Sequence, residues 1–334
     1  MYTSYTNKNL IDFSIEKEFE KNNICDLKSL LKDEKLKPLE LLVKISDGTI
    51  EIVNHTVDIP NLWRANTTVH MLESAIHYYG LTDLNCSFIV NLDDGCHDPN
   101  SITRLTTFGR PRHSNHIGIT DPLSWSMMVP IDRTVSFNSI KLTDTHSFEK
   151  KKPMMIFRGA DTGAGKPNTL NQRIRMSQEY FGHSFIDVKI TKLLGVTDIE
   201  LEQAGINKDQ ILSESITPKQ QLEYKYLLYL YGNCLSTDRT IWNLLANSLM
   251  VMVTPAQEDY HIVWHQLFME KEDVVPTFSE QGFYENFLAW QKTHSELEYI
   301  EKQIHFGNVL SDPKLNIEYT KEVLIKYNDL YNNN

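Results

Sequence analysis

Short apolar runs alternate with helix-prone segments through the second half of the chain, and this alternation restricts the folds open to it. The apolar runs are Met154–Phe157, Ser184–Ile190, Tyr224–Leu230 and Leu249–Val253. Helix-prone segments lie between them at Asn171–Tyr180 and Thr240–Ala246. Strands that alternate with helices form parallel sheets with helical crossovers. The sequence therefore predicts an α/β protein that binds its ligands at the carboxyl ends of the strands.

The first half of the chain has strand and helix signals of its own, so we expect two domains. An Asp-Gly pair between β-rich runs predicts a hairpin over Leu39–Val53. A helix over Thr68–Tyr79 and a buried strand over Cys86–Leu92 follow. At 334 residues the chain exceeds the usual size of one domain. We place the domains at residues 1–150 and 151–310, with a linker at Lys150–Pro153 and a terminal helix at 311–334 that packs back on the first domain.

Composition excludes several classes of protein. Hydrophobic residues make up 41% and charged residues 23% of the chain, as in a soluble globular protein, and the net charge is −11. No dense basic run is present, so a nucleic-acid partner is not expected. The 4 cysteines form no Cys-x-x-Cys pair, which favours a reduced compartment. Because neither a signal peptide nor a bilayer-length apolar run is visible, we expect a cytoplasmic protein without a transmembrane segment.

Two polar turns that carry arginine follow predicted strands. In the first turn, Arg158 and Gly159 come directly after Phe157, and Arg173 returns on the next helix. The turn resembles a phosphate loop, but Gly165-Lys166 is followed by proline, which lacks the N–H that such a loop uses. Arginine presents a planar fork that matches phosphate oxygens. The turn therefore predicts either a phosphate site or arginines on an ordinary surface loop.

The second turn precedes the helix around Thr240–Ala246. Ser236 and Thr237 offer hydroxyl groups and Arg239 a charge near a helix N-terminus, which favours an anion. Ordinary helix capping by Ser236 or Thr237 explains the same residues. The tyrosines of the preceding strand are expected mainly in the core, with base stacking as the alternative, and Tyr226 is retained as a candidate for donor binding.

Asp93 and Asp94 end the strand Cys86–Leu92 and are the leading carboxylate candidates. A carboxylate at a strand end can act as a general base towards an acceptor hydroxyl. The pair can also hold a divalent cation, or form a plain Asp-Asp-Gly turn. Motifs of other enzyme classes are absent from the sequence. The chain has no Gly-x-Ser-x-Gly, no Gly-x-Gly-x-x-Gly and no His-Glu-x-x-His, so a hydrolase, a nicotinamide dehydrogenase and a zinc protease are poorly supported.

Taken in order, these segments resemble the capsule-associated and protein O-glucosyltransferase group, glycosyltransferase family 90. The segments that carry the resemblance are Phe157-Arg158-Gly159, Arg173, Tyr224–Leu227, Gly232, Ser236, Arg239, Asn247–Val251, Glu258–Tyr260 and Asp273–Pro276. The resemblance spans about residues 86–306 and is strongest from 154 to 277. Secretory members carry a signal peptide, disulfides and a retention tail. None is seen here, which points to a microbial or viral enzyme.

The resemblance implies a GT-B fold, in which a cleft separates two Rossmann-like domains. It implies inverting transfer of a sugar, usually glucose or xylose, from a UDP-sugar to a hydroxyl of a glycan acceptor, with no essential metal or other cofactor. It places the catalytic base at Asp94, with Asp93 as the alternative. It places donor contacts at Arg158, Gly159, Arg173, Ser236 or Thr237, Arg239 and Glu258. The rival hypotheses are a metal-dependent nucleotide-sugar transferase and a non-catalytic nucleotide- or sugar-binding protein.

Overall fold

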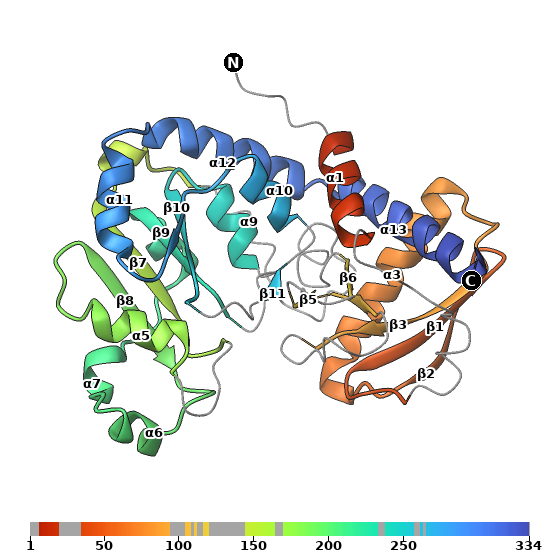
Figure 1. Cartoon of the computed structure of the whole chain (residues 1–334), viewed down its shortest axis with the longest axis horizontal. Helices are drawn as coiled ribbons and strands as arrows, with labels where there is room; N and C mark the ends of the chain where they lie inside the picture. Colours follow the sequence, from red (N-terminus) through yellow and green to blue (C-terminus); the bar gives the residue numbers. More distant parts are fainter. Residues whose placement is uncertain are drawn as a thin grey trace.

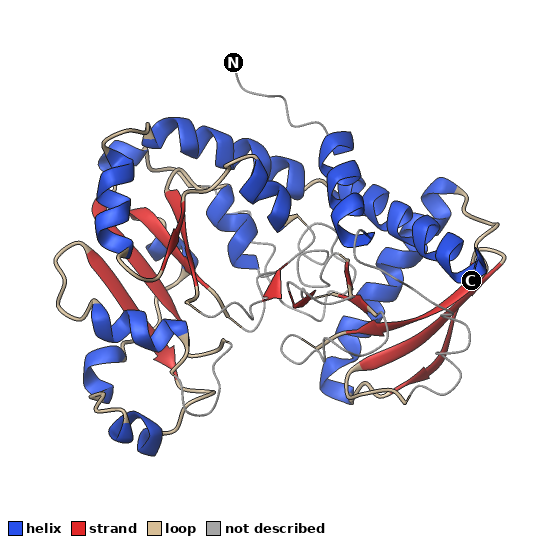
Figure 2. Cartoon of the chain, viewed as in Figure 1, coloured by secondary structure: helices blue, strands red, loops and turns tan. Residues whose placement is uncertain are grey.

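The computed structural model describes most of the chain and divides it between two sheets. The described residues are 7–19, 35–93, 104–107, 110–111, 116–119, 144–163, 170–232, 238–256, 261–262 and 265–333. Among them, the strands form two five-stranded sheets and one two-stranded ribbon. Helices cover both sheets, which lie in opposite halves of the molecule (Figure 1, Figure 2). The predicted α/β class is therefore confirmed.

The C-terminal sheet is entirely parallel, with the order β12-β10-β9-β7-β8. Its strands are β7 (Lys152–Ala160), β8 (Ile186–Lys192), β9 (Tyr224–Leu230), β10 (Leu249–Thr254) and β12 (Thr277–Ser279). The chain starts at β7, moves outward to β8, and then crosses back to β9 on the other side of β7. The winding therefore reverses between β7 and β9, which makes this a doubly wound sheet.

Helices cover both faces of the C-terminal sheet because its strands are apolar on both sides. They are α5 (Gln172–Glu179), α6 (Asp198–Gln203), α7 (Lys208–Ile211), α8 (Pro218–Gln221), α9 (Asp238–Leu244), α10 (Gln266–Lys271), α11 (Phe283–Gln291) and α12 (Glu296–Leu310). Phe157 of β7 faces one core, with Phe287 of α11. Ile156, the next residue back, faces the other core, with Trp242 of α9. This alternation along β7 fixes which side chains reach each face.

The N-terminal sheet is mixed, with the order β2-β1-β3-β4-β6. Its strands are β1 (Glu40–Ser46), β2 (Thr49–His55), β3 (Cys86–Asn91), β4 (Leu105–Thr106) and β6 (Ile117–Gly118). β3, β4 and β6 are parallel, whereas β1 runs antiparallel to β2 and β3. The predicted hairpin is confirmed. Its turn residues Asp47 and Gly48 have φ of 51° and 72°, as a tight turn between twisted strands requires.

In the described part of the N-terminal half, the long helices are α1 (Asn7–Phe19), α3 (Leu62–Tyr79) and α13 (Pro313–Asn333). The helix α3 ends where Gly80 adopts a left-handed φ of 62°. Figure 1 shows α13 running from α12 across to α3. The Tyr319 hydroxyl of α13 donates to the carbonyl oxygen of Gly118 in β6 at 2.7 Å. One apolar cluster extends from Phe88 in β3, through Phe306, to Met250 in β10, so the two halves share a core.

The segment predicted as a linker, Lys150–Pro153, is instead ordered. The short helix η2 (Phe148–Lys150) leads directly into β7, and another, η1 (Ile59–Asn61), precedes α3. The buried Lys151 ammonium lies 2.5 Å from an Asp144 carboxylate oxygen, which holds the segment against the sheet. A ribbon of β5 (Arg110–Pro111) and β11 (His261–Ile262) joins the halves by backbone pairing. No helix in the described ranges is long and apolar enough to cross a membrane.

Candidate functional site

The carboxyl ends of β7 and β9 meet where the winding reverses, which is where doubly wound sheets bind ligands. Glycines line both ends: Gly159 in β7, Gly163 just after it, and Gly232 just after β9. Gly163 has a φ of 145°, which favours glycine, and a Cβ there would lie 3.1 Å from the Tyr231 carbonyl oxygen. The backbones of the two strand ends therefore approach closely.

The first turn of α5 lies against these strand ends. Asn171 caps the helix, with its Oδ1 accepting from the Ile174 N–H at 3.1 Å. The buried Gln172 amide accepts from the Tyr231 N–H and donates to the Val253 carbonyl oxygen, both at 2.9 Å. Gln172 thus ties the end of β9 to that of β10. A helix N-terminus held in this way at a switch point favours a negatively charged ligand.

Arg173, one of the predicted donor contacts, bridges the two strand ends. Its Nη1 donates to the Ala160 carbonyl oxygen at 2.9 Å and to Thr162 Oγ1 at 2.7 Å. Its Nη2 donates to the Leu230 carbonyl oxygen at 3.2 Å. These carbonyl and hydroxyl acceptors fix the orientation of the guanidinium group.

Arg239, at the start of α9, reaches the same place from the other strand end. Its Nη2 donates to the Arg158 carbonyl oxygen at 2.6 Å. The Cζ atoms of Arg173 and Arg239 lie 5.2 Å and 5.0 Å from the centroid of the Phe157 ring, within cation–π range. Two guanidinium groups therefore share one aromatic ring at the switch point. Guanidinium groups gathered in this way suit phosphate groups, which their planar fork can contact through two hydrogen bonds.

Arg158 occupies a different environment from the other two arginines. Its Nη2 lies 2.6 Å from Asp187 Oδ2 on the neighbouring strand β8, and its Nη1 donates to the Asp187 carbonyl oxygen at 3.1 Å. Only 11% of the Arg158 side chain is exposed. Asp187 thus engages this guanidinium group through both its carboxylate and its backbone carbonyl oxygen. Arg158 therefore contributes to the arginine cluster through its backbone carbonyl group.

Asp161, which follows β7, fills an anion-binding turn within the protein. Backbone N–H groups of Leu194, Gly195 and Val196 all donate to its buried carboxylate. Successive backbone N–H groups of this kind form a nest suited to an anion. The Asp161 carboxylate therefore occupies the nest beside β8, and an external anion has no room there. The glycine-lined ends of β7 and β9 are the candidate ligand site.

Tyr226 lies apart from the arginines. It pairs with Met155 in the sheet register, three residues before Arg158, and only 5% of it is exposed. Its hydroxyl donates to Glu296 at 2.7 Å and accepts from Gln291 Nε2 at 3.0 Å. Burial raises the pKa of this hydroxyl, and the hydrogen bond to Glu296 raises it further. The core position expected for the tyrosines of this strand holds for Tyr226, and donor contact would require a different packing.

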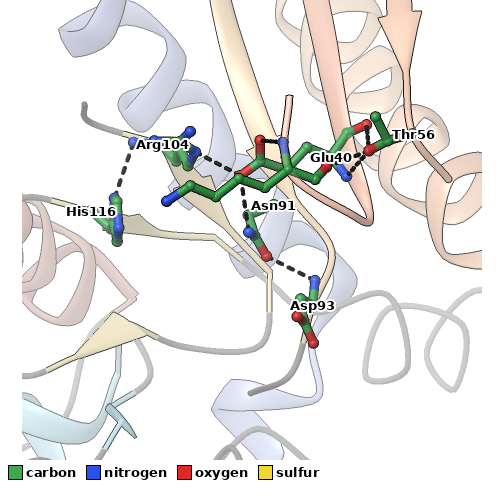
Figure 3. A network of polar contacts seen from close by, with 7 residues as sticks. Glu40, Thr56, Asn91, Asp93, Arg104 and His116 are labelled. Atoms are coloured by element: carbon green, nitrogen blue, oxygen red, sulfur yellow. Dashed lines mark hydrogen bonds and ion pairs between the residues drawn. The ribbon is translucent and has the colours of Figure 1, made fainter. Parts of the chain in front are cut away.

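In the N-terminal half, Asp93 lies two residues beyond the carboxyl end of β3 and is held there through its backbone. The Asp93 N–H donates to Asn91 Oδ1 at 2.8 Å (Figure 3). Asn91 Nδ2 in turn donates to the Glu40 carboxylate at 3.2 Å. Nearby, Arg64 of α3 donates to the Leu92 carbonyl oxygen at 2.9 Å. The strand end that presents Asp93 is therefore held from several sides.

Four predicted site residues lie outside the described residues: Asp94, Ser236, Thr237 and Glu258. Of the predicted donor contacts that are described, the structure brings together Arg173, Arg239, Gly159 and the backbone of Arg158. The described part of the chain contains no group of three or more His, Cys, Asp or Glu side chains that could hold a metal ion.

The fold and site define a doubly wound α/β protein with an arginine-bearing site at its switch point. Comparison with protein-family models and with curated proteins finds no match to the chain. The geometry of the site therefore carries the functional argument.

Sequence reasoning missed three residues that shape this site: Phe157 as the shared ring, Gln172 as the tie between strands, and Asp187 as the partner of Arg158. A signal was present for Phe157, because alternation along β7 places it on the same face as Gly159. Gln172 and Asp187 depend on contacts between segments far apart in sequence, and no local pattern marks them.

Proposed function

We propose that the protein is an inverting glycosyltransferase of GT-B type that transfers a sugar from a UDP-sugar, with glucose or xylose as the first candidates, to a hydroxyl of a glycan acceptor. One observation carries the proposal: Arg173 and Arg239 converge on Phe157 at the switch point of a doubly wound sheet. The resemblance to glycosyltransferase family 90 supplies the substrate class and the transfer reaction. The arginine pair supplies the place for the donor diphosphate.

In the proposed reaction, a carboxylate after β3 removes the proton from the acceptor hydroxyl. Asp94 is the first candidate for this base and Asp93 the second. The hydroxyl oxygen forms a bond to the anomeric carbon as the bond from that carbon to the diphosphate oxygen breaks, with inversion. The guanidinium groups of Arg173 and Arg239 stabilise the charge that develops on the departing UDP. They are held by Ala160, Leu230 and Arg158 carbonyl groups before the donor binds.

The direct test is UDP release from the purified chain. UDP-glucose, UDP-xylose, UDP-galactose and GDP-sugars are each supplied with and without an oligosaccharide acceptor. The proposal expects one UDP-sugar to give acceptor-dependent release that persists in excess chelator. Asp94→Asn or Asp93→Asn should abolish release while UDP still raises the melting temperature. The exposed Asp83→Asn serves as the matched control and should retain full activity.

Three results would contradict parts of the proposal. Loss of release in chelator would favour the metal-dependent transferase. A thermal shift with UDP-sugars but no release under any condition would favour a binding protein. Neither shift nor release with any nucleotide sugar would remove the proposed function altogether.

A further inference from the structure

The Glu40–Arg104 ion pair lies in the interior of the N-terminal half, next to the end of β3. Arg104 Nε is 2.6 Å from Glu40 Oε1, and the two side chains are 1% and 0% exposed. Bringing both charges out of water is costly, and apolar residues of similar volume often give equal or greater stability. The ion pair is therefore poorly explained by stability alone, and its neighbours indicate what it orders.

Glu40 is held on every side by donors from different segments. Its Oε1 accepts from Arg104 and from Asn91, and its Oε2 accepts from the Lys37 N–H at 2.7 Å. Its own N–H donates to Thr56 Oγ1 at 3.0 Å. The Glu40 carboxylate thus has one position, directly across the antiparallel pair from Asn91.

That position dictates the orientation of the Asn91 amide. A carboxylate only accepts hydrogen bonds, so the Asn91 NH₂ group must face Glu40. The Asn91 oxygen then faces the Asp93 N–H, which only donates (Figure 3). Rotating the amide by half a turn would set donor against donor and acceptor against acceptor. Glu40 therefore fixes the orientation of the Asn91 amide, and this amide in turn holds the backbone N–H of Asp93.

Arg104 completes the arrangement by joining the next two strands. It precedes β4, and its backbone N–H donates to His116 Nδ1, just before β6, at 3.3 Å. This buried network therefore connects β1, β3 and the residues that precede β4 and β6, and it includes the backbone of Asp93.

We infer that Glu40 and Asn91 are positioning residues that set the position of the Asp93 backbone after the end of β3. This inference rests on the proposed function, in which Asp93 or its neighbour in sequence, Asp94, is the base. Neither Glu40 nor Asn91 needs to touch the substrate, since both act through the backbone of Asp93. Misplacing a catalytic group by about 1 Å can lower a rate by about a hundredfold.

The test uses Asn91→Leu, which replaces the amide by an apolar side chain of similar size and removes both hydrogen bonds, with Asn91→Ala as a second variant. The expected result is a fall in kcat of about tenfold or more, while the UDP-sugar KM and the affinity for UDP change less than about twofold. Hydrogen–deuterium exchange of the Asp93 amide should accelerate. Glu40→Gln, followed in the same assays, should add little to Asn91→Leu in the double variant.

Tyr319→Phe is the matched control, because it also removes one buried hydrogen bond from the N-terminal half, to Gly118, but not at this strand end. It should leave kcat and Asp93 exchange unchanged. If wild type transfers sugar and Asn91→Leu keeps its kcat, or if Asp93 exchange is unaltered, the positioning role is refuted while the proposed function stands. If wild type releases no UDP from any donor, the proposed function fails and takes this inference with it.

Discussion

Gly232 makes room for the guanidinium group of Arg173. A Cβ atom at position 232 would lie 2.6 Å from Arg173 Nη2 and 3.2 Å from its Cζ. The first distance is shorter than Cβ atoms show and the second is tight, so the arginine can lie in its present position across the end of β9 only because residue 232 is glycine. The atoms in the way belong to the tip of a long side chain. That tip can move aside at little cost to the fold.

Gly232→Ala should therefore displace Arg173 rather than unfold the protein. We expect UDP affinity to fall about tenfold to a hundredfold, the range for losing a hydrogen bond to a charged group. Stability should change by less than about 1 kcal/mol, as at sites where only a flexible side chain must yield. Titration calorimetry with UDP and chemical denaturation measure the two effects.

The control for this variant is Gly195→Ala. Its Cβ would find its nearest atom, the Asp161 carbonyl oxygen, at 3.6 Å, an ordinary contact. Gly195 also lies in a loop near the C-terminal sheet, so the two variants differ mainly in what the new methyl group meets. Unchanged UDP affinity in Gly232→Ala would show that the position of Arg173 does not matter for binding.

Arg158 and Arg239, which look equivalent in sequence, should respond differently to substitution. Arg239→Gln should weaken UDP binding about tenfold, because it removes one of the two charges on Phe157. Arg158→Gln should instead destabilise the protein by about 1–3 kcal/mol, because it leaves Asp187 without its partner. Its effect on UDP binding should be smaller.

Asp187→Asn separates these roles further, since it weakens the same ion pair from the other side. It should reproduce the stability loss of Arg158→Gln and leave UDP affinity near that of wild type. An equal loss of UDP affinity in Arg158→Gln and Arg239→Gln would mean that Arg158 leaves Asp187 to contact the donor.

The contrast between these arginines shows how far sequence reasoning reaches. The strand β9 matches its predicted bounds because a continuous apolar run between polar residues identifies a buried strand locally. Asn171 is a helix cap, and Asp47-Gly48 a tight turn, for equally local reasons. The pairing of Arg158 with Asp187 depends instead on the register between β7 and β8, which is set by packing across the sheet.

The hydrogen-bond network around Glu40 could not be predicted from the sequence for the same reason. Glu40 begins a strand and carries a charge, a residue type that is seldom buried, yet it is fully buried. Its burial depends on Arg104, which is 64 residues away. Tyr226 illustrates the opposite case, because its place in an apolar strand favoured the core from the start.

Gln303 of α12 should be important for stability because its side chain hydrogen-bonds backbone groups at the edge of β10. Its buried side chain accepts from the Met250 N–H and donates to the Met250 carbonyl oxygen, both at 3.0 Å. The neighbouring strand β12 pairs with β10 only from Met252 onward. Gln303→Ala would leave two buried backbone groups unsatisfied, so we expect a loss of about 2–4 kcal/mol. Asn308→Ala, on the exposed side of α12, should change the free energy of unfolding by less than about 0.5 kcal/mol. Urea denaturation measures both variants. If Gln303→Ala lowers the free energy of unfolding no more than Asn308→Ala does, Gln303 does not have this stabilising role.

His265 should make the stability of the protein sensitive to acid. The residue precedes α10, and both nitrogens of its ring are shielded from solvent although the residue as a whole is partly exposed. Burial lowers the pKa of His265 from its ordinary value of 6.5 to about 3. The cause is the cost of placing a charged imidazole among apolar neighbours such as Phe306.

Between these two pH values the unfolded chain binds a proton that the folded chain does not. The free energy of unfolding should therefore fall as the pH decreases from about 6.5 towards 3, by up to about 1.4 kcal/mol per pH unit from this residue. Above pH 6.5 the imidazole is neutral in both states and contributes no slope. Urea denaturation at a series of pH values measures the dependence.

His265→Asn should flatten this slope, because the side chain no longer titrates. Met269→Leu, in the same pocket, keeps the histidine and should shift stability by a similar amount at every pH. The difference between the two variants isolates protonation from packing, since both alter the same cavity. If His265→Asn leaves the slope between pH 6 and 4 as steep as in wild type, the acid sensitivity arises from other groups and the imidazole accepts its proton without unfolding.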